Sequence, residues 1–504
     1  MTRQPETSGV APVVLRSVLV LAAIVSGHAL AQTVDITPRL NLGLTWSDNI
    51  DTDDERARKD WLLNIAPGLS VSRASGRLRG QFDASLRSLA YASEHEENET
   101  HLTFSGNGLL ELLEDSLFIN AQASVSRNNT SAFGRRASGD QLSARKDDET
   151  RVWSLAPYWQ MRFGDRGQAR LGYELRALTG GNDSLSNTRE QRWTLSVEDT
   201  SALRFIGWGF NYQHLDTRYK GDRGRDVAEE IARALLYVNL DPQYRLKFSA
   251  GHESNDYQTA RREKGSLWGA GFDWYPTERT SLTAMGEKRF FGHGYDVQFQ
   301  HRQARALWQF GATRQISSTL QELAGGFTLD PVFQGIYQLT DETLSEAERM
   351  RLAREEYERM GGLGVRSNSY YLQQSLRAGL SLIGVRNTLT LTAQRSDRQR
   401  LNNLLGVGEG DDFARHDNID TRSLALALSH RLTPLSTLNL AASYSHAEGQ
   451  GADRDDVRRN IYQLGLTRRL SADTNLGLIY RHQKARGTDD YRENAVSATL
   501  GTRF

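Results

Sequence analysis

Apolar and polar residues alternate along this chain with a period of two, and the alternation continues over most of its 504 residues. In the segment 39–46, leucine and tryptophan occupy every second position, and arginine, asparagine, glycine and threonine lie between them. Successive side chains of a β-strand point to opposite faces, so this segment has one apolar and one polar face as a strand. The pattern predicts strands with an apolar environment on one side and water on the other.

Two architectures use such strands, a soluble sandwich of two sheets and a membrane barrel. A sandwich rarely extends over a chain of this length without dividing into domains. A barrel strand hides its apolar half in the alternation, which agrees with a mean hydropathy of only −0.58. The alternation recurs at, among other places, residues 78–86, 117–125, 153–163, 169–177, 268–274, 282–290, 304–312, 372–382, 438–444 and 476–480.

The connections between these segments alternate in length. Tight turns at 74–76, 114–116, 164–167, 241–243, 276–278 and 433–435 are separated by longer polar stretches such as 48–60, 93–100, 128–148, 179–188, 216–225 and 397–421. Short periplasmic turns and longer outer loops are typical of outer-membrane barrels, whose single-chain bacterial forms have an even number of strands. The sequence therefore predicts an all-β fold: a single large antiparallel, up-and-down transmembrane β-barrel of about 20–22 strands.

The two ends of the sequence indicate export to a Gram-negative outer membrane. Arg3 and Arg16 precede or begin an apolar run at 18–25, and small residues at 29–31 provide a cleavage site. That run is shorter than the roughly 20 residues of a membrane-spanning helix. We expect a signal peptide at 1–31 and the barrel at 32–504. The last alternating segment ends in Phe504, and we expect it to dock on the outer-membrane barrel assembly machinery.

Composition excludes several functions. The 62 basic and 62 acidic residues balance, so no overall positive field favours nucleic acid. The chain has no cysteine, which removes disulfides, thiolate nucleophiles and cysteine zinc sites. No nucleophile-elbow, phosphate-loop or dinucleotide motif is present. We expect no catalytic residues, no cofactor and no metal site. Carboxylates crowd the loops at 48–55 and 94–99, where hydration is the expected role and divalent-cation bridging to lipopolysaccharide is the alternative.

The alternation stops between residues 317 and 364. Thr343 and Glu346 form a capping box, residues 346–360 favour a helix, and two glycines follow. We predict one short helical insertion at 317–364, placed by strand parity in the periplasm or the barrel lumen. It is either a solvated insertion, a plug, or a docking site for a periplasmic export protein at the helix 346–360.

If the apolar face of the barrel meets lipid, the polar face lines the lumen. Arginine exceeds acid among the expected lumen-lining residues, which favours anionic or strongly hydroxylated solutes. Alternatively, these arginines pair with inward acids and only satisfy the wall. Three tyrosines, Tyr158, Tyr370 and Tyr491, are candidates for sugar stacking, although an interfacial belt is the simpler role. The expected lumen-lining residues are Arg79, Arg87, Arg162, Arg170, Glu174, Arg176, Glu287, Arg289, Arg305 and Arg481, with Asp83 beside them.

The segment 274–280 (WYPTERT), followed by KRFFG at 288–292, resembles the signature of the PEP-CTERM-system-associated outer-membrane proteins. These are β-barrel porins found with exosortase and exopolysaccharide gene clusters. The segments 47–50 and 253–257 also match the family pattern. The resemblance implies an outer-membrane barrel in a cell that exports a polysaccharide, and it implies no catalytic residues. The matching residues, which we expect to be structural as turn and interfacial aromatic positions, are Trp274, Pro276, Arg279, Thr280, Arg289, Phe290, Phe291 and Gly292.

Four functions in three classes, conduit, structural barrel and enzyme, follow from these expectations. We favour a porin-like conduit associated with exopolysaccharide export or surface assembly, because a barrel of this size encloses more space than side chains fill. The alternatives are a general diffusion porin, a barrel that tethers polysaccharide at the surface, and, least favoured, an outer-membrane enzyme. A TonB-dependent transporter would need a long N-terminal plug, and the first strand is expected too early for one. The expected partners are outer-membrane lipid, lipopolysaccharide and exopolysaccharide.

Overall fold

The computed structural model describes residues 34–55, 57–127, 131–134, 149–164, 167–180, 187–200, 203, 205–220, 226–258, 262–324, 337, 365, 367–401, 411–452, 454–487 and 490–504. The expected signal peptide at 1–31 and the expected helix at 346–360 lie outside the described residues. Within the described ranges, no helix is long and apolar enough to cross a bilayer.

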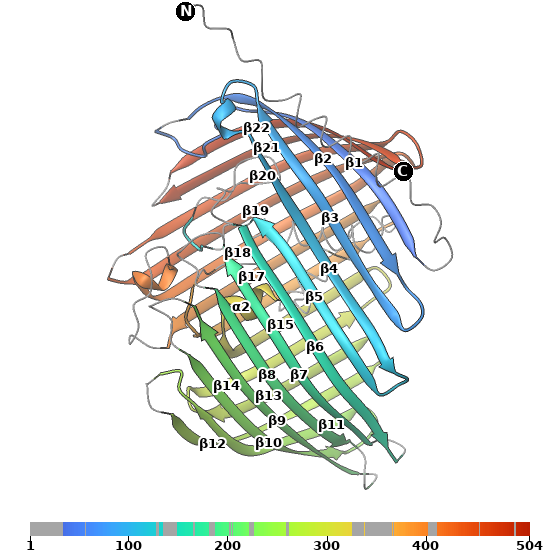
Figure 1. Cartoon of the computed structure of the whole chain (residues 1–504), viewed down its shortest axis with the longest axis vertical. Helices are drawn as coiled ribbons and strands as arrows, with labels where there is room; N and C mark the ends of the chain where they lie inside the picture. Colours follow the sequence, from blue (N-terminus) through green and yellow to red (C-terminus); the bar gives the residue numbers. More distant parts are fainter. Residues whose placement is uncertain are drawn as a thin grey trace, which may run out of the picture.

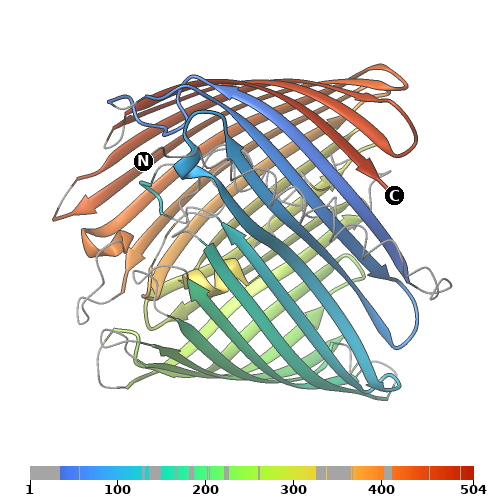
Figure 2. The same cartoon turned by 45° about the horizontal axis from the view of Figure 1, so that its top comes forward.

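Twenty-two strands form one closed antiparallel sheet, which confirms the predicted barrel (Figures 1 and 2). Each strand pairs with its neighbours in sequence, and β1 also pairs with β22. The strands are β1 (Asp35–Ser47), β2 (Asp60–Arg73), β3 (Leu78–Tyr91), β4 (Glu99–Leu113), β5 (Leu117–Arg127), β6 (Glu149–Phe163), β7 (Gly167–Gly180), β8 (Thr188–Asp199), β9 (Ile206–Tyr219), β10 (Val227–Asn239), β11 (Tyr244–Asn255), β12 (Glu263–Thr277), β13 (Thr280–Arg289), β14 (Gly292–Arg302), β15 (Ala306–Ser317), β16 (Tyr371–Ile383), β17 (Asn387–Arg400), β18 (His416–Thr433), β19 (Ser436–Gly451), β20 (Asp456–Arg469), β21 (Thr474–Gly487) and β22 (Tyr491–Arg503).

The seam between the first and last strands closes the barrel. Its register runs from Arg39 opposite Arg503 to Ser47 opposite Ala495. The amide of Phe504 adds a hydrogen bond to the carbonyl of Pro38 at 2.9 Å. In Figure 1 the blue strands β1–β3 therefore lie beside the red strands β20–β22. Closure removes both sheet edges, which a bilayer interior could not solvate.

The outer face of the barrel is apolar, and the inner face is polar. Trp61 is 50 % exposed, whereas its neighbour Leu62, on the inner face, is 1 % exposed. The same contrast follows the register around the barrel, with leucine, phenylalanine, tyrosine and tryptophan exposed at outward positions. The predicted alternation of lipid-facing and lumen-facing residues is thus present in strands all around the barrel.

We call the end where β1 begins and β22 ends the terminus end, and the opposite end the loop end. Connections at the terminus end are short, as at 278–279 and 434–435, whereas the longest connections, 128–148, 318–370 and 401–415, lie at the loop end. We expected the strand before the helical insertion to run toward the periplasm. That expectation is wrong, because β15 is an odd-numbered strand and ends at the loop end, opposite both termini.

One short α-helix, α2 (Thr319–Leu323), begins the insertion and lies inside the barrel (Figure 2). Its first turn is capped by Ser318, whose Oγ accepts from the amide of Gln321. The side chain of Gln321 donates to Glu190 of β8 at 3.3 Å, and Glu322 accepts from Arg398 of β17 at 3.4 Å. Both partners lie on the inner face. Of the two expected places for the insertion, the lumen is therefore the one that α2 occupies.

Arginine placed on the outer face should destabilise the barrel, and the neighbouring inner position provides the control. Leu440 points outward between Leu428 and Leu464, whereas Asn439 points inward and is exposed to the lumen. We expect Leu440→Arg to lower the free energy of unfolding by about 2–4 kcal/mol, because a cation near the bilayer midplane is poorly solvated. Asn439→Arg should change it little. Denaturant unfolding in liposomes measures both, and equal effects would contradict the assignment of faces.

Candidate functional site: the barrel lumen

The structure places the expected lumen-lining residues on several walls of the barrel. All except Arg305 lie at inward strand positions, and Arg305 lies in the turn between β14 and β15. Four of them, Glu174, Arg176, Glu287 and Arg289, come together in the wall formed by β7–β13. Arg481 lies in the wall formed by β20–β22 with its own carboxylate partner.

Glu190 is the centre of the first ion-pair network. This carboxylate of β8 is 1 % exposed and accepts from Arg192 at 3.0 Å and from Arg176 at 3.4 Å. Arg176 also donates to Glu174 at 2.7 Å. A buried carboxylate is tolerated only when cations and hydrogen-bond donors surround it. The Tyr370 hydroxyl, at 3.4 Å from the second carboxylate oxygen, completes the shell.

Glu253 and Glu287 anchor a second network on β10–β13. Arg289 donates to Glu253 at 2.6 Å, and the amide of Phe290 donates to the same carboxylate. Arg233 donates to Glu287 at 2.8 Å. Buried aromatic rings join the two networks, since Tyr257 packs on Phe290 and on Tyr370. Burial raises the pKa of the Tyr257 and Tyr370 hydroxyls well above the ordinary value, so both are neutral.

The opposite wall carries two compact ion pairs. Arg481 donates to Glu493 at 2.8 Å, and Ser47 donates to the same carboxylate at 3.0 Å. Arg39 forms a bidentate pair with Asp83. Sequence reasoning had named Arg481 and Asp83 but missed Glu190, Glu253 and Glu493, although each occupies an inward position of an alternating segment. The geometry of these arginines agrees with the alternative in which they form ion pairs with acidic residues of the inner face.

The described parts of three loop-end connections lie in the lumen and contact one another there. Arg459 of β20, which is 4 % exposed, donates to the carbonyls of Ala132, Phe133 and Gly134 at 3.2, 3.1 and 2.6 Å. Asp412 accepts from the amide of Ala132 at 2.9 Å. These contacts tie the β5–β6 connection to β20 and to the β17–β18 connection. A buried apolar cluster forms around them from Ala132, Phe133, Val365, Tyr371, Phe413, Ile419, Ala447 and Val457.

Asp411 links the β15–β16 connection to the same structure. Its carboxylate accepts from the amides of Asn368 and Phe413, both at 2.9 Å, and from the Ser367 hydroxyl at 3.2 Å. Thr319 in turn donates to the carbonyl of Ser367 at 2.9 Å. Burial raises the pKa of Asp411 to about 7. We call the segments 131–134, 318–324, 365, 367–370 and 411–416 the loop plug, because together they occupy the loop end of the lumen.

The terminus end of the lumen is basic. Arg79, Arg162, Arg302, Arg431 and Arg503 are at inward positions and, among the described residues, their side chains make no hydrogen bond or ion pair. The acids on this part of the wall already have partners: Asp273 is paired with Lys247 at 2.5 Å, Glu198 accepts from Gln168 at 2.5 Å, and Glu111 accepts from the amide of Asp115 at 2.7 Å. We call this surface, including Arg170, the basic vestibule.

The three candidate tyrosines all lie inside the barrel, so an interfacial belt is the wrong role for them. Tyr158 stacks on Phe118 at 5.0 Å between ring centroids, and the guanidinium of Arg170 covers its other side at 3.7 Å. Tyr370 is buried in the first ion-pair network, and Tyr491 is buried on the inner face of β22. Of the three, Tyr158 borders the basic vestibule.

The residues that carry the family resemblance lie at the two ends of β13. Trp274, Pro276, Arg279 and Thr280 flank the turn at the terminus end, where Trp274 stacks on Tyr244 at 5.9 Å. Arg289, Phe290, Phe291 and Gly292 form the two-residue turn at the loop end, and Gly292 has a positive φ of 96°, which favours glycine. The second turn also reaches the lumen through Arg289 and Glu253.

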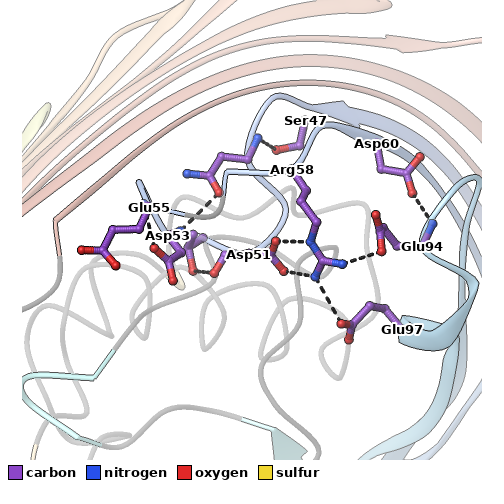
Figure 3. A network of polar contacts seen from close by, with 10 residues as sticks. Ser47, Asp51, Asp53, Glu55, Arg58, Asp60, Glu94 and Glu97 are labelled. Atoms are coloured by element: carbon purple, nitrogen blue, oxygen red, sulfur yellow. Dashed lines mark hydrogen bonds and ion pairs between the residues drawn. The ribbon is translucent and has the colours of Figure 1, made fainter.

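The carboxylate-rich outer loops are held by an arginine (Figure 3). Arg58 donates to both oxygens of Asp51 at 2.5 Å and contacts Glu94 and, at 3.4 Å, Glu97. Asp60 accepts from the amides of Ser93 and Glu94 and so joins the β1–β2 and β3–β4 connections. In the described ranges, no three potential ligands are grouped as a metal site.

Comparisons with known proteins define the class of protein through its fold. No family profile and no curated protein sequence matches the chain. The siderophore receptor PirA from Acinetobacter baumannii superposes with a TM-score of 0.50 at 8 % identity, over 94 % of this chain and 81 % of that one. The FrpB iron transporter from Neisseria meningitidis gives 0.49 at 10 % identity, over 96 % and 83 %. The OccK2 structure from Pseudomonas aeruginosa gives 0.35 at 12 % identity, over 93 % and 98 %.

The protein is thus a 22-strand β-barrel of the Gram-negative outer-membrane type, similar in fold to siderophore-receptor barrels. At this level of identity the similarity concerns the barrel alone.

Removing Arg459 should release the loop plug. Because the chain has no cysteine, a cysteine at Ala132, which is 0 % exposed, would report access to a water-soluble maleimide without background. We expect slow labelling of Ala132→Cys and labelling at least tenfold faster when Arg459→Gln is added, since three carbonyls lose their charged donor. Arg468→Gln, an outward arginine of the same strand, is the control. Unchanged labelling would show that Arg459 does not hold this segment.

The plug should also loosen as pH rises. The pKa of Asp411 lies above its ordinary value of 3.8, so its stabilising contribution is full below that value and is gone above about pH 7. Labelling of Val365→Cys, divided by that of the exposed Ser75→Cys to cancel thiol ionisation, should rise between pH 5 and 8. Asp411→Asn, which stays neutral, should flatten the rise. A pH-independent ratio in the parent would contradict this role.

Proposed function

We propose that the protein is an outer-membrane conduit for anionic, strongly hydroxylated solutes, with an acidic exopolysaccharide as the substrate class. The observation that carries the proposal is the basic vestibule, where inward arginines have no acid partner among the described residues. The link to exopolysaccharide export or surface assembly comes from the resemblance to the PEP-CTERM-associated proteins. We keep signal cleavage near Ala31 and the mature barrel at 32–504 as part of this proposal.

The geometry of arginine supports an anionic solute. A guanidinium presents a planar fork of donors that matches carboxylate or sulfate oxygens, and it is more weakly hydrated than an ammonium group. Inside a lumen, low-dielectric walls focus the field of such residues on the solute path. The arginines of the two ion-pair networks differ, because Glu190 and Glu253 already neutralise them. The vestibule arginines remain available to a solute.

The position of the vestibule supports export. In outer-membrane barrels the short turns face the periplasm and the long loops face outside. A polyanion that leaves the periplasm would therefore meet Arg79, Arg162 and Arg302 first and the loop plug last. Tyr158 beside this path is packed between Phe118 and Arg170, so it holds the Arg170 guanidinium in place rather than stacking on a sugar ring. Passage then requires the loop plug to move.

Ion selectivity in planar bilayers tests the vestibule. In the Arg459→Gln background, where we expect the plug to open, chloride should permeate several-fold better than potassium. Combined Arg79→Gln, Arg162→Gln and Arg302→Gln should reduce this ratio at least threefold, because the inward field disappears. Arg468→Gln, on the outer face at the same end, should leave it unchanged. A preference for potassium over chloride in the Arg459→Gln variant that keeps these three arginines would overturn the proposal.

Deletion of the gene separates conduit from tether. Polysaccharide trapped in the periplasm would support export through the barrel. Normal secretion with altered attachment at the surface would contradict the conduit and favour a structural barrel that holds polysaccharide.

A further inference from the structure

The outer face of β20–β22 carries four cations in two directly opposed pairs. Arg458 of β20 lies opposite Arg486 of β21, and Lys484 of β21 lies opposite Arg492 of β22. Directly opposite residues have Cβ atoms about 4.5–5.5 Å apart, and like charges in this arrangement destabilise a sheet. All four point outward, because the alternating positions, such as Arg459 and Glu493, point into the lumen. We call them the outer cation cluster.

Most carboxylates near this cluster accept from backbone amides: Asp54 accepts from the amide of Arg492 at 2.8 Å, and Asp490 accepts from the amide of Gly487 at 2.6 Å. Arg458 donates to Asp456 at 3.1 Å, and Asp456 also contacts His446. The side chains of Lys484, Arg486 and Arg492 make no hydrogen bond or ion pair with any residue that the structure describes. Three of the four cationic side chains therefore have no hydrogen-bond or ion-pair partner within the described chain, and they lie on adjacent strands within two residues of one another along the barrel wall.

A second place on the same outer wall shows how the chain resolves the same conflict internally. Arg395 of β17 lies directly opposite Arg422 of β18. Here Asp420 bridges them, because it accepts from Arg395 at 2.7 Å and from Arg422 at 3.1 Å. In the outer cation cluster, Asp456 contacts Arg458 alone, and no described carboxylate bridges either opposed pair. An anion from outside the chain would have the role that Asp420 has between β17 and β18.

The level of the cluster on the wall indicates where that anion comes from. Exposed tyrosines at Tyr444, Tyr462 and Tyr480 end the apolar part of the outer face, as interfacial aromatics do. Lys484 lies four residues beyond Tyr480 toward the loop end. At about 3.4 Å per residue and a strand tilt of about 40°, this places it roughly 10 Å above the aromatic belt. That is the level of the lipid head groups in the outer leaflet.

We propose that the outer cation cluster binds the phosphate groups of a phosphorylated glycolipid of the outer leaflet, namely lipopolysaccharide. A phosphate monoester carries about 1.5–2 negative charges and three acceptor oxygens, so it can bridge both opposed pairs. Arginine provides two parallel donors for it, and lysine adds a point charge. The lipid stays at the barrel surface, so this site is independent of the lumen and of the proposed transport.

Binding of defined lipids to the purified barrel in detergent tests the proposal by native mass spectrometry. The test variant is Lys484→Gln with Arg486→Gln, and the matched control is Arg395→Gln with Arg422→Gln, which removes two cations from the same outer face. Parent and control should bind lipopolysaccharide equally, and the test variant should bind at least tenfold more weakly. Heat-shifted gel mobility confirms that each variant is folded.

Two further ligands identify the group that is bound. Lipopolysaccharide with its lipid phosphates removed should bind the parent as weakly as the test variant binds the intact lipid. Inorganic phosphate at millimolar concentration should not displace the intact lipid, because it has no acyl chains to hold it at the wall. Equal binding of intact lipid to parent and test variant would overturn the proposal, as would equal binding of dephosphorylated lipid to the parent or displacement by free phosphate.

Discussion

The closed ring of backbone hydrogen bonds is the constraint on which every other feature depends. In a bilayer no water is available to a free strand edge, so every amide and carbonyl of the spanning segments must pair within the sheet. The β1–β22 seam meets this requirement, down to the amide of Phe504 on the carbonyl of Pro38. Closure fixes which side chains face lipid, and it leaves an interior too wide for side chains from the wall alone to fill.

The chain fills that interior unequally. Toward the loop end, the described parts of three connections lie in the lumen and are held by Arg459, Asp411 and Glu190, which are buried ionisable groups with several partners. Toward the terminus end, arginines remain without acid partners among the described residues. The same residue type therefore has two roles, which are decided by whether an inward acid lies on the neighbouring strand. Residues of the polar inner face hold the loop plug in place at one end and form the surface that a solute would meet at the other.

The fold could be predicted from sequence because the alternation is local, whereas the lumen depends on contacts between distant strands. Whether residues such as Leu44 and Trp61 face lipid or the lumen can be predicted from their immediate neighbours in the sequence. The inward direction of Glu190 follows from the same rule, but its partner Tyr370 lies 180 residues away. The partners of Arg459 had no sequence signal, since they are the main-chain carbonyls of another connection. The direction of the insertion failed for a related reason, because an error of one strand in the count reverses every later strand.

The seam has a further consequence for how the molecule reaches its folded state. The hydroxyl of Thr45 bonds that of Ser497 across a separation of 452 positions, so the most distant parts of the polypeptide are direct neighbours. Contacts of this kind carry a large loop-closure entropy and form slowly. Until they form, β1 and β22 each offer an open ladder to any other extended chain. The barrel thus has no smaller piece that is complete, and its first and last strands must be kept from foreign partners until they meet.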